Sequence, residues 1–370
     1  MLAFSPLVLL GLRCVVLAMR IPKTNKFPFP KLELHLHLDG AARFTTLLEL
    51  SKQKGIPLGG ATTEDELKKL LVSTEPASLQ KVLTAFDTFD PLFVDDPSVM
   101  ERIAYETAED LAADGVVYFE ARYSPQEKIS SAESEITLQS VVEAVWRGLS
   151  RAEADFGIHG RQILCCIAGM PEWNWKILDL VKSCAHLGVV GIDVAGSSAS
   201  ADEKYEQSVI DVFREATRLG LHRTVHAGEA GGVADVVQAL EAMSAERIGH
   251  GYRVLNDEEV YRENFVDSHR AHLEACPLSS YLTGAVKGEW KDHPIKRWAA
   301  DAVDFSISRD DPTCFDNSYA DELDLVHDDI GLSLHEIWTA QLNAARASFA
   351  PEPLKGRIIQ QVLAAEPTKI

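Results

Sequence analysis

Residues 223–251, RTVHAGEAGGVADVVQALEAMSAERIGHG, contain the pattern that decides the fold. Runs 223–228 and 247–251 have the short apolar composition of buried strands, and residues 234–245 repeat apolar side chains every three or four positions, as a helix does. Two strands joined through a helix pair in parallel, because the crossover returns the chain to the same edge. The stretch therefore predicts one strand–helix–strand unit of a parallel sheet.

The same alternation recurs along the chain. Helical periodicity is also present in residues 100–113, 138–156 and 202–219. Eight strand-helix units favour an α/β fold of the (β/α)₈ TIM-barrel type, with the active site at the carboxyl ends of the strands. The runs that predict strands are 31–38, 116–123, 162–169, 189–195, 223–228, 247–251, 272–277 and 304–308.

The separation between the first two strands, residues 39–115, is too long for a single crossover. We expect extra helices inserted after strand 1, in a position to cover the mouth of the barrel. Nothing after Phe29 resembles a linker or a repeat, so we expect residues 21–370 to form a single catalytic barrel domain and residues 1–20 to be an extension outside the fold.

Composition excludes several classes of protein. Of the 370 residues, 46% are apolar and 25% are charged, which excludes a disordered chain, a collagen-like fibre and a multi-span membrane protein. With 36 basic and 56 acidic residues the net charge is −20, which repels phosphate backbones and anionic lipids. We therefore expect no nucleic-acid partner and no stable membrane insertion, whereas the net charge says little about small ligands. The sequence indicates no protein partner.

The cysteines indicate the compartment. None of the six forms a CxxC pair or a regular framework, which favours a reducing, cytoplasmic location. Secretion or membrane association through the apolar residues 2–19 is the alternative. Arg13 interrupts that run, which is too short to span a bilayer and has no basic residue ahead of it.

Histidines mark the end of strand 1. His35 and His37 alternate with leucines, so both imidazoles lie on one face of the strand, close enough to bind one metal ion. The alternative is a pair of surface histidines on an amphipathic strand.

Three further strand ends carry polar groups. His226 and Glu229 end the fifth strand, and their alternative is a helix-surface pair. His250 lies between two glycines at the end of the sixth, where its alternative is a hydrogen-bonded core histidine. Asp310 and Asp311 end the eighth, where repelling carboxylates need a cation, a proton or a solvated turn.

All of these residues fall at the ends of expected strands one, five, six and eight, which share one rim in a closed barrel. Three imidazoles and a carboxylate suit Zn²⁺ with an open position for water, whose pKa the metal lowers. The residues thus predict metal-assisted hydrolysis of a polarised C–N, C–O or P–O bond. They do not specify the substrate.

Six segments taken in order resemble the successive motifs of the adenosine deaminase family, in the metal-dependent amidohydrolase superfamily. The resemblance runs from about Lys31 to near Phe349. The segments are LELHLHLDGA (32–41), EARYSP (120–125), RTVHAGEA (223–230), RIGHGYRV (247–254), ACPLSSYLTGA (275–285) and SRDDPTCF (308–315).

The resemblance implies one Zn²⁺ per subunit and the reaction in which adenosine and 2′-deoxyadenosine become inosine and 2′-deoxyinosine. Glu229 would protonate the purine N1, which requires a carboxyl of raised pKa, and His250 and Asp311 would orient the attacking water and take its proton. Asp311 would stay ionised beside the cation. The zinc ligands implied are His35, His37, His226 and Asp310.

For substrate binding the resemblance implies His37, Asp39 at a ribose hydroxyl, the backbone of Gly196 at the purine, and an apolar wall. By this resemblance Leu79, Val82 and Phe86 would form that wall, and a plain amphipathic helix is their alternative. Two departures from the family pattern are Ser197-Ser198, where an acidic pair is common, and Arg309, where a small polar residue is usual. Since neighbours in a strand face opposite ways, we expect Arg309 to contact the barrel wall or the helices.

Two other functions remain as alternatives. One is deamination of another aminopurine, either adenine or an N6-substituted AMP, although Asp39 would repel a nearby phosphate. The other is a catalytically silent binding protein or growth-factor-like relative, which would have no need of Glu229, His250 and Asp311.

Overall fold

The computed structural model describes residues 26–131, 134–196 and 203–368. The expected extension 1–20 and the Ser197-Ser198 departure lie outside these residues. No helix within the described ranges is both long and apolar enough to cross a bilayer.

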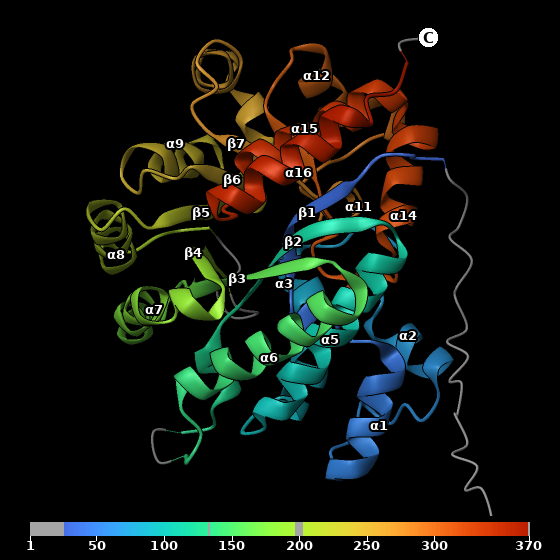
Figure 1. The fold of residues 1–370 in the computed structure, drawn as a ribbon, viewed down its shortest axis with the longest axis vertical. Helices are drawn as coiled ribbons and strands as arrows, with labels where there is room; N and C mark the ends of the chain where they lie inside the picture. The colour runs from blue at the N-terminus through green and yellow to red at the C-terminus, as the bar shows by residue number, and fades with distance from the viewer. Residues whose placement is uncertain (1–25, 132–133, 197–202, 369–370) are drawn as a thin grey trace, which may run out of the picture.

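Eight parallel strands form the barrel, and each pairs with its neighbours in sequence order (Figure 1). The TIM-barrel prediction is therefore confirmed. The strands are β1 (Lys31–His37), β2 (Val116–Tyr123), β3 (His159–Ile167), β4 (Val189–Ala195), β5 (His222–Ala227), β6 (Arg247–His250), β7 (His272–Ala275) and β8 (Phe305–Ile307).

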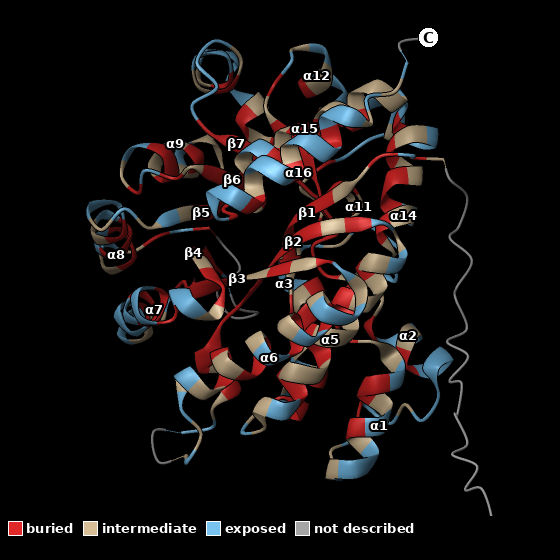
Figure 2. Cartoon of the chain, viewed as in Figure 1, coloured by how far each residue is buried: buried red, intermediate tan, exposed pale blue. Residues whose placement is uncertain are grey.

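Helices surround the strands, and Figure 2 shows the strands largely buried while the outer helix faces are exposed. Helices α1 to α4 precede the crossover helix α5, so the expected insertion after strand 1 is present. The helices are α1 (Phe44–Lys54), α2 (Glu64–Leu71), α3 (Leu79–Leu83), α4 (Phe86–Phe89), α5 (Pro97–Ala113), α6 (Leu138–Phe156), α7 (Pro171–Ser183), α8 (Gln207–Arg218), α9 (Val233–Glu241), α10 (Glu258–Tyr261), α11 (Pro277–Leu282), α12 (Pro294–Ala300), α13 (Pro312–Phe315), α14 (Tyr319–Asp324), α15 (Leu334–Ala347) and α16 (Glu352–Ala364).

The barrel closes between β8 and β1 at Asp310. A single parallel bridge joins Leu36 to Asp310, in which Asp310 N donates to the carbonyl of His35 and His37 N donates to the carbonyl of Asp310. Side chains strengthen the seam, since Ser308 Oγ accepts from the backbone N–H of His35 at 3.0 Å. The hydrogen bonds of the closing bridge thus involve His35, His37 and Asp310, which the sequence predicted for the site.

Arg309 lies beside this seam and pairs with Glu33 of β1. Its Nε and Nη2 lie 3.0 Å from the two oxygens of Glu33, and both side chains are buried. Arg309 therefore contacts the barrel wall, as expected, and its guanidinium is neutralised there.

Candidate functional site

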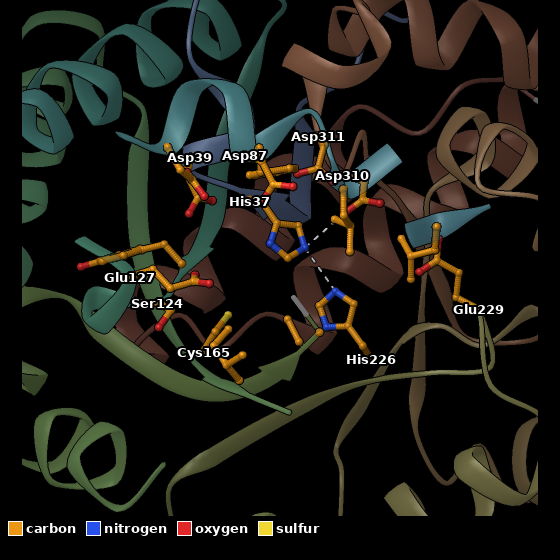
Figure 3. A pocket seen from close by; sticks show the side chains of 18 of the residues that line it. His37, Asp39, Asp87, Ser124, Glu127, Cys165, His226, Glu229, Asp310 and Asp311 are labelled. Carbon is orange, nitrogen blue, oxygen red and sulfur yellow. Dashed lines mark hydrogen bonds and ion pairs between the residues drawn. The ribbon is translucent and has the colours of Figure 1, made fainter. Parts of the chain in front are cut away.

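Four ligand-type side chains meet at the mouth of the barrel. His35 and His37 come from β1, His226 from β5, and Asp310 follows β8, and their ligand atoms all lie within 4.8 Å of one another. His37 Nε2 is 3.2 Å from His226 Nε2 and 3.3 Å from Asp310 Oδ1 (Figure 3). His35 Nε2 lies 3.2 Å from the same oxygen.

This spacing fits a tetrahedral metal site. Bonds of about 2.0 Å to nitrogen and oxygen place neighbouring ligand atoms about 3.3 Å apart. His35 Nε2 and Asp310 Oδ1 are buried and have no hydrogen-bond partner in the described part of the chain. Buried polar atoms are rarely left unpaired, so an ion is the partner that this cluster could take.

Carboxylates behind the cluster fix the orientation of two imidazoles. His35 Nδ1 is 2.7 Å from Glu274 Oε2, and His226 Nδ1 is 3.1 Å from both Asp193 Oδ2 and the carbonyl of Val194. Because each Nδ1 then carries the proton, Nε2 presents its lone pair to the cluster.

Arg122 of β2 joins these two carboxylates. Its Nη1 is 2.9 Å from Asp193 and its Nη2 is 2.8 Å from Glu274, and all three side chains are fully buried. The guanidinium holds the pKa of the Glu274 carboxyl well below its usual range against the opposing effect of burial. The Arg122 guanidinium thus holds both carboxylates that orient the imidazoles of His35 and His226.

Seven residues other than glycine have a positive φ in the described part of the chain, and two of them are in the site. Asp310 has φ of 68° and His250 has φ of 66°, in the left-handed region that residues other than glycine rarely adopt. Asp310 is held there by its two bridge hydrogen bonds and by Ser279 Oγ, which donates to Oδ2 at 2.7 Å. Such strain persists where the surroundings fix it, which is common at functional sites.

Glu229 lies on one side of the cluster and carries a perturbed carboxyl. Burial, with the nearby charges of Asp310 and Glu203, raises its pKa to about 8. Thr283 Oγ1 donates to its Oε1 at 2.8 Å, and His250 Nε2 lies 3.4 Å from its Oε2. A carboxyl that keeps its proton near neutral pH has the protonation state that a general acid needs.

His250 and Asp311 lie beside the cluster, and each has a buried polar atom without a hydrogen-bond partner in the described part of the chain. Burial lowers the pKa of His250 well below its usual value, which keeps the imidazole neutral. Asp311 Oδ1 is buried without a partner among the described residues, and burial and Asp310 raise its carboxyl pKa. An ionised Asp311 therefore requires the compensating charge of a cation.

Two glycines make room for these groups. A Cβ on Gly249 would lie 2.8 Å from Cε1 of His35, and a Cβ on Gly40 would collide with the Asp311 carboxylate. Hence the glycine before His250 admits the imidazole of a different strand, and the glycine after Asp39 admits the Asp311 carboxylate.

A pocket with about 800 Å³ of space between protein atoms, part of it open to solvent, adjoins the cluster. It brings together most of the residues that the sequence predicted for the site, while His35 lies fully buried behind it. Those that line it are His37, Asp39, Leu79, Phe86, Gly196, His226, Glu229, His250, Asp310 and Asp311.

Val82 is, besides His35, the predicted residue that does not line the cavity. It is not among the lining residues and packs instead with Leu282, Cys314 and Phe315 in a small apolar cluster. Leu83 takes its place in the cavity wall. Helix α3 ends at Leu83 and α4 starts at Phe86, so one continuous helical face cannot be extended across both.

Several residues of the site were not predicted. Arg122, Asp193 and Glu274 support the imidazoles, and a charge within an otherwise apolar barrel strand is the signal that could have found them. Glu203 binds the backbone after β5 from an irregular segment, where no pattern marked it. Other lining residues missed were Leu83, Asp87, Asp90, Tyr123, Ser124, Glu127, Cys165, Ile167 and Ala195.

Comparisons with known proteins agree with this geometry. A family model described as adenosine deaminase matches residues 30–365. The adenosine deaminase of Gallus gallus is 40% identical over 351 residues, which cover 92% of this chain and 96% of that protein.

Two solved structures share the fold at lower identity. The adenine deaminase of Arthrobacter aurescens superposes with a TM-score of 0.79 at 26% identity, covering 91% of this chain and 98% of that one. The N6-methyl-AMP deaminase of Arabidopsis thaliana gives a TM-score of 0.77 at 27% identity, covering 92% and 98%.

Proposed function

The chain belongs to the adenosine deaminase family, and from this premise we propose that its cavity hydrolyses adenosine and 2′-deoxyadenosine to inosine and 2′-deoxyinosine. Water adds its oxygen to C6 of the purine, the bond from C6 to the exocyclic nitrogen breaks, and ammonia leaves. The observation that carries the proposal is the buried Glu229 carboxyl of raised pKa beside the cluster of three imidazoles and Asp310.

The cofactor that we propose is one Zn²⁺, held by His35, His37, His226 and Asp310. The ligand spacing and the unpartnered His35 Nε2 and Asp310 Oδ1 support a metal at this position. A bound zinc ion supplies Lewis-acid activation of water near neutral pH.

Glu229 acts as the proton donor. Its carboxyl gives a proton to the purine N1, which makes C6 more electrophilic, and Thr283 keeps the carboxyl in place through the hydrogen bond to Oε1. The pKa of about 8 supports this role, since an ordinary glutamate would already be ionised at pH 7.

His250 and Asp311 act on the attacking water. His250 is kept neutral by burial and accepts the proton that the water loses. Asp311, with its free Oδ1, accepts a hydrogen bond from the water and directs its lone pair toward C6.

The remaining substrate contacts follow from the lining of the cavity. Asp39 accepts a hydrogen bond from a ribose hydroxyl, the backbone of Gly196 approaches the purine, and Leu79 and Phe86 cover its apolar faces. His37 adjoins both the cluster and the substrate. The higher identity to an adenosine deaminase than to the solved adenine and N6-methyl-AMP deaminases supports a nucleoside substrate.

We propose further that residues 21–370 form one catalytic domain in a reducing, cytoplasmic environment. A single apolar core that includes Phe27 near its start and Val362 near its end supports the first statement. The five cysteines in the described part of the chain are buried and unpaired, which supports the second.

The test follows the ultraviolet spectrum of adenosine with metal-replete protein, with chelator-stripped protein and with the Glu229→Gln variant. We expect conversion to inosine by the first sample alone. No conversion by protein with its metal shown to be bound would contradict the proposal.

A further inference from the structure

The end of the cavity away from Glu229 is acidic. Figure 3 shows Asp39, Ser124 and Glu127 across His37 from Glu229, and Asp87 and Asp90 line the cavity as well. Among the described residues that line the cavity, none is an arginine or a lysine. A ribose bound at Asp39 would extend its 5′ substituent into this end.

The buried Lys128 forms ion pairs with two carboxylates at this acidic end. Lys128 is 1% exposed, and its Nζ lies 2.7 Å from Asp39 Oδ2 and 3.2 Å from Asp90 Oδ1. A single cation cannot neutralise Asp39, Asp90 and Glu127 together. Burial raises the pKa of the Asp90 carboxyl to about 6 and that of Glu127 to about 7, with repulsion from Asp39 adding to both.

Ser124 provides a second and independent sign of a ligand. Its side chain is 2% exposed and lines the cavity, yet its Oγ has no hydrogen-bond partner in the described part of the chain. Buried hydroxyls are seldom unpaired, so this oxygen is available to a polar group of the substrate.

We propose that Ser124, Asp90 and Glu127, with Asp90 held by Lys128, form a subsite that binds a cationic 5′ substituent. The chain would then also deaminate adenosines that carry a 5′-ammonium group. The inference rests on the proposed function, because it requires the ribose to lie at Asp39.

The physical basis is the charge balance of the subsite. A 5′-phosphate carries about −1.5 to −2 charges near pH 7 and would face the ionised Asp39 and Asp90 and a partly ionised Glu127 across a partly desolvated space. An ammonium group instead donates charge-assisted hydrogen bonds to Asp90 and Glu127 and completes the neutralisation that Lys128 begins. Asp90 and Glu127 thus favour cationic nucleosides.

The test compares kcat/KM at pH 7.5 for adenosine, 5′-deoxyadenosine, 5′-amino-5′-deoxyadenosine and AMP. In wild type we expect the 5′-amino compound to exceed 5′-deoxyadenosine by about tenfold, and AMP to fall at least about a hundredfold below adenosine. In the Asp90→Asn/Glu127→Gln variant we expect the ratio of amino to deoxy substrate to fall about tenfold.

Controls keep the outcomes separate. Asp65→Asn removes an exposed carboxylate of the same insertion that does not line the cavity, and it should leave the ratio unchanged. The two single variants are measured beside the double variant, so that the ratio is obtained even where the double variant does not fold. Deamination of adenosine with an unaltered ratio, or AMP as good a substrate as adenosine, overturns the subsite alone. Failure of metal-replete wild type on all four compounds overturns the proposed function as well.

Discussion

The carboxylate of Glu203 accepts a hydrogen bond from the backbone N–H of Glu229, which lies 3.1 Å from each of its two oxygens. It also accepts from Gly231 at 2.9 Å and from Ala230 at 3.3 Å. Glu203 precedes α8, whereas Glu229 follows β5, so one side chain ties together the segments after two adjacent strands. The same negative charge contributes to the raised pKa of the Glu229 carboxyl.

Replacing Glu203 should therefore move the pH dependence of the reaction. Glu229 must be protonated to act, so activity falls as the pH rises through its pKa of about 8. Glu203→Gln removes a neighbouring negative charge, which lowers the pKa of Glu229 and shifts the alkaline limb of kcat/KM to lower pH. Glu206→Gln, in the same segment but bonded to Gly169, serves as the control. An unmoved limb in the Glu203 variant would assign it a structural role only.

Glu229→Gln should abolish most of the catalytic activity while metal and nucleoside binding are kept. The amide has nearly the same shape and cannot act as an acid toward N1, so we expect kcat to fall by about a thousandfold. Metal content and the affinity for a purine nucleoside product should change little. Steady-state kinetics, metal analysis and inosine binding check the three statements, and a loss of metal would point to misfolding instead.

The same substitution should stabilise the metal-free protein at alkaline pH. Burial raises the pKa of Glu229 from 4.5 to about 8 on folding, so the folded chain holds this proton more tightly than the unfolded chain. Stability is then lost progressively as pH rises between these values. Glu229→Gln removes this effect, so urea unfolding should show a variant more stable than wild type at pH 8.5 and similar to it near pH 4.5. The exposed Glu259→Gln is the control.

Arg122→Met should damage both stability and metal retention. It leaves Asp193 and Glu274 as buried charges without their shared guanidinium, which costs about 3 to 5 kcal/mol of unfolding free energy. Loss of the support behind His35 and His226 should weaken metal binding by about 10- to 100-fold. Urea unfolding and chelator competition measure the two effects. Arg147→Met, which breaks an exposed pair with Glu101, should cost less than about 1 kcal/mol.

Removal of the metal should lower activity and thermal stability together. Zn²⁺ at a thousandfold excess over its Kd would stabilise the folded chain by about 4 kcal/mol, because it binds the assembled cluster and not the separated strands. We expect Tm to fall on chelation and to recover on addition of one equivalent of Zn²⁺. His226→Gln should lose this response, whereas His272→Gln, at a buried histidine paired with Asp304 and Ser306, should keep it.

Much of the barrel could be predicted from sequence because buried strands and amphipathic helices have distinct periods. Strands β2 and β4 and helix α6 begin and end where the pattern placed them. Strand β8 spans only Phe305–Ile307, and the chain meets β1 at Asp310, beyond the end of the strand. This bridge joins distant parts of the chain, so no local pattern contains it.

The candidate site likewise contains residues that the sequence could predict and residues that it could not. Residues at strand ends, such as His226 and Asp310, could be predicted because the barrel brings every strand end to one rim. Lys128 could not, since its partners Asp39 and Asp90 belong to segments whose approach depends on how the insertion folds. A charged residue inside an apolar strand, such as Arg122, is visible in the sequence. Its role becomes clear only when the barrel brings its partners Asp193 and Glu274 beside it.

The bridge between Leu36 and Asp310 also dictates when the site can first exist during synthesis. His35 and the Ser308 hydroxyl that receives its backbone N–H are separated by 273 positions. At about 5 to 20 residues per second, the ribosome takes roughly 14 to 55 s to add that length. Throughout this interval β1 is an unpaired edge on its closing side, open to wrong partners and to chaperones. The four-residue cluster is therefore completed only after the last barrel strand has left the ribosome.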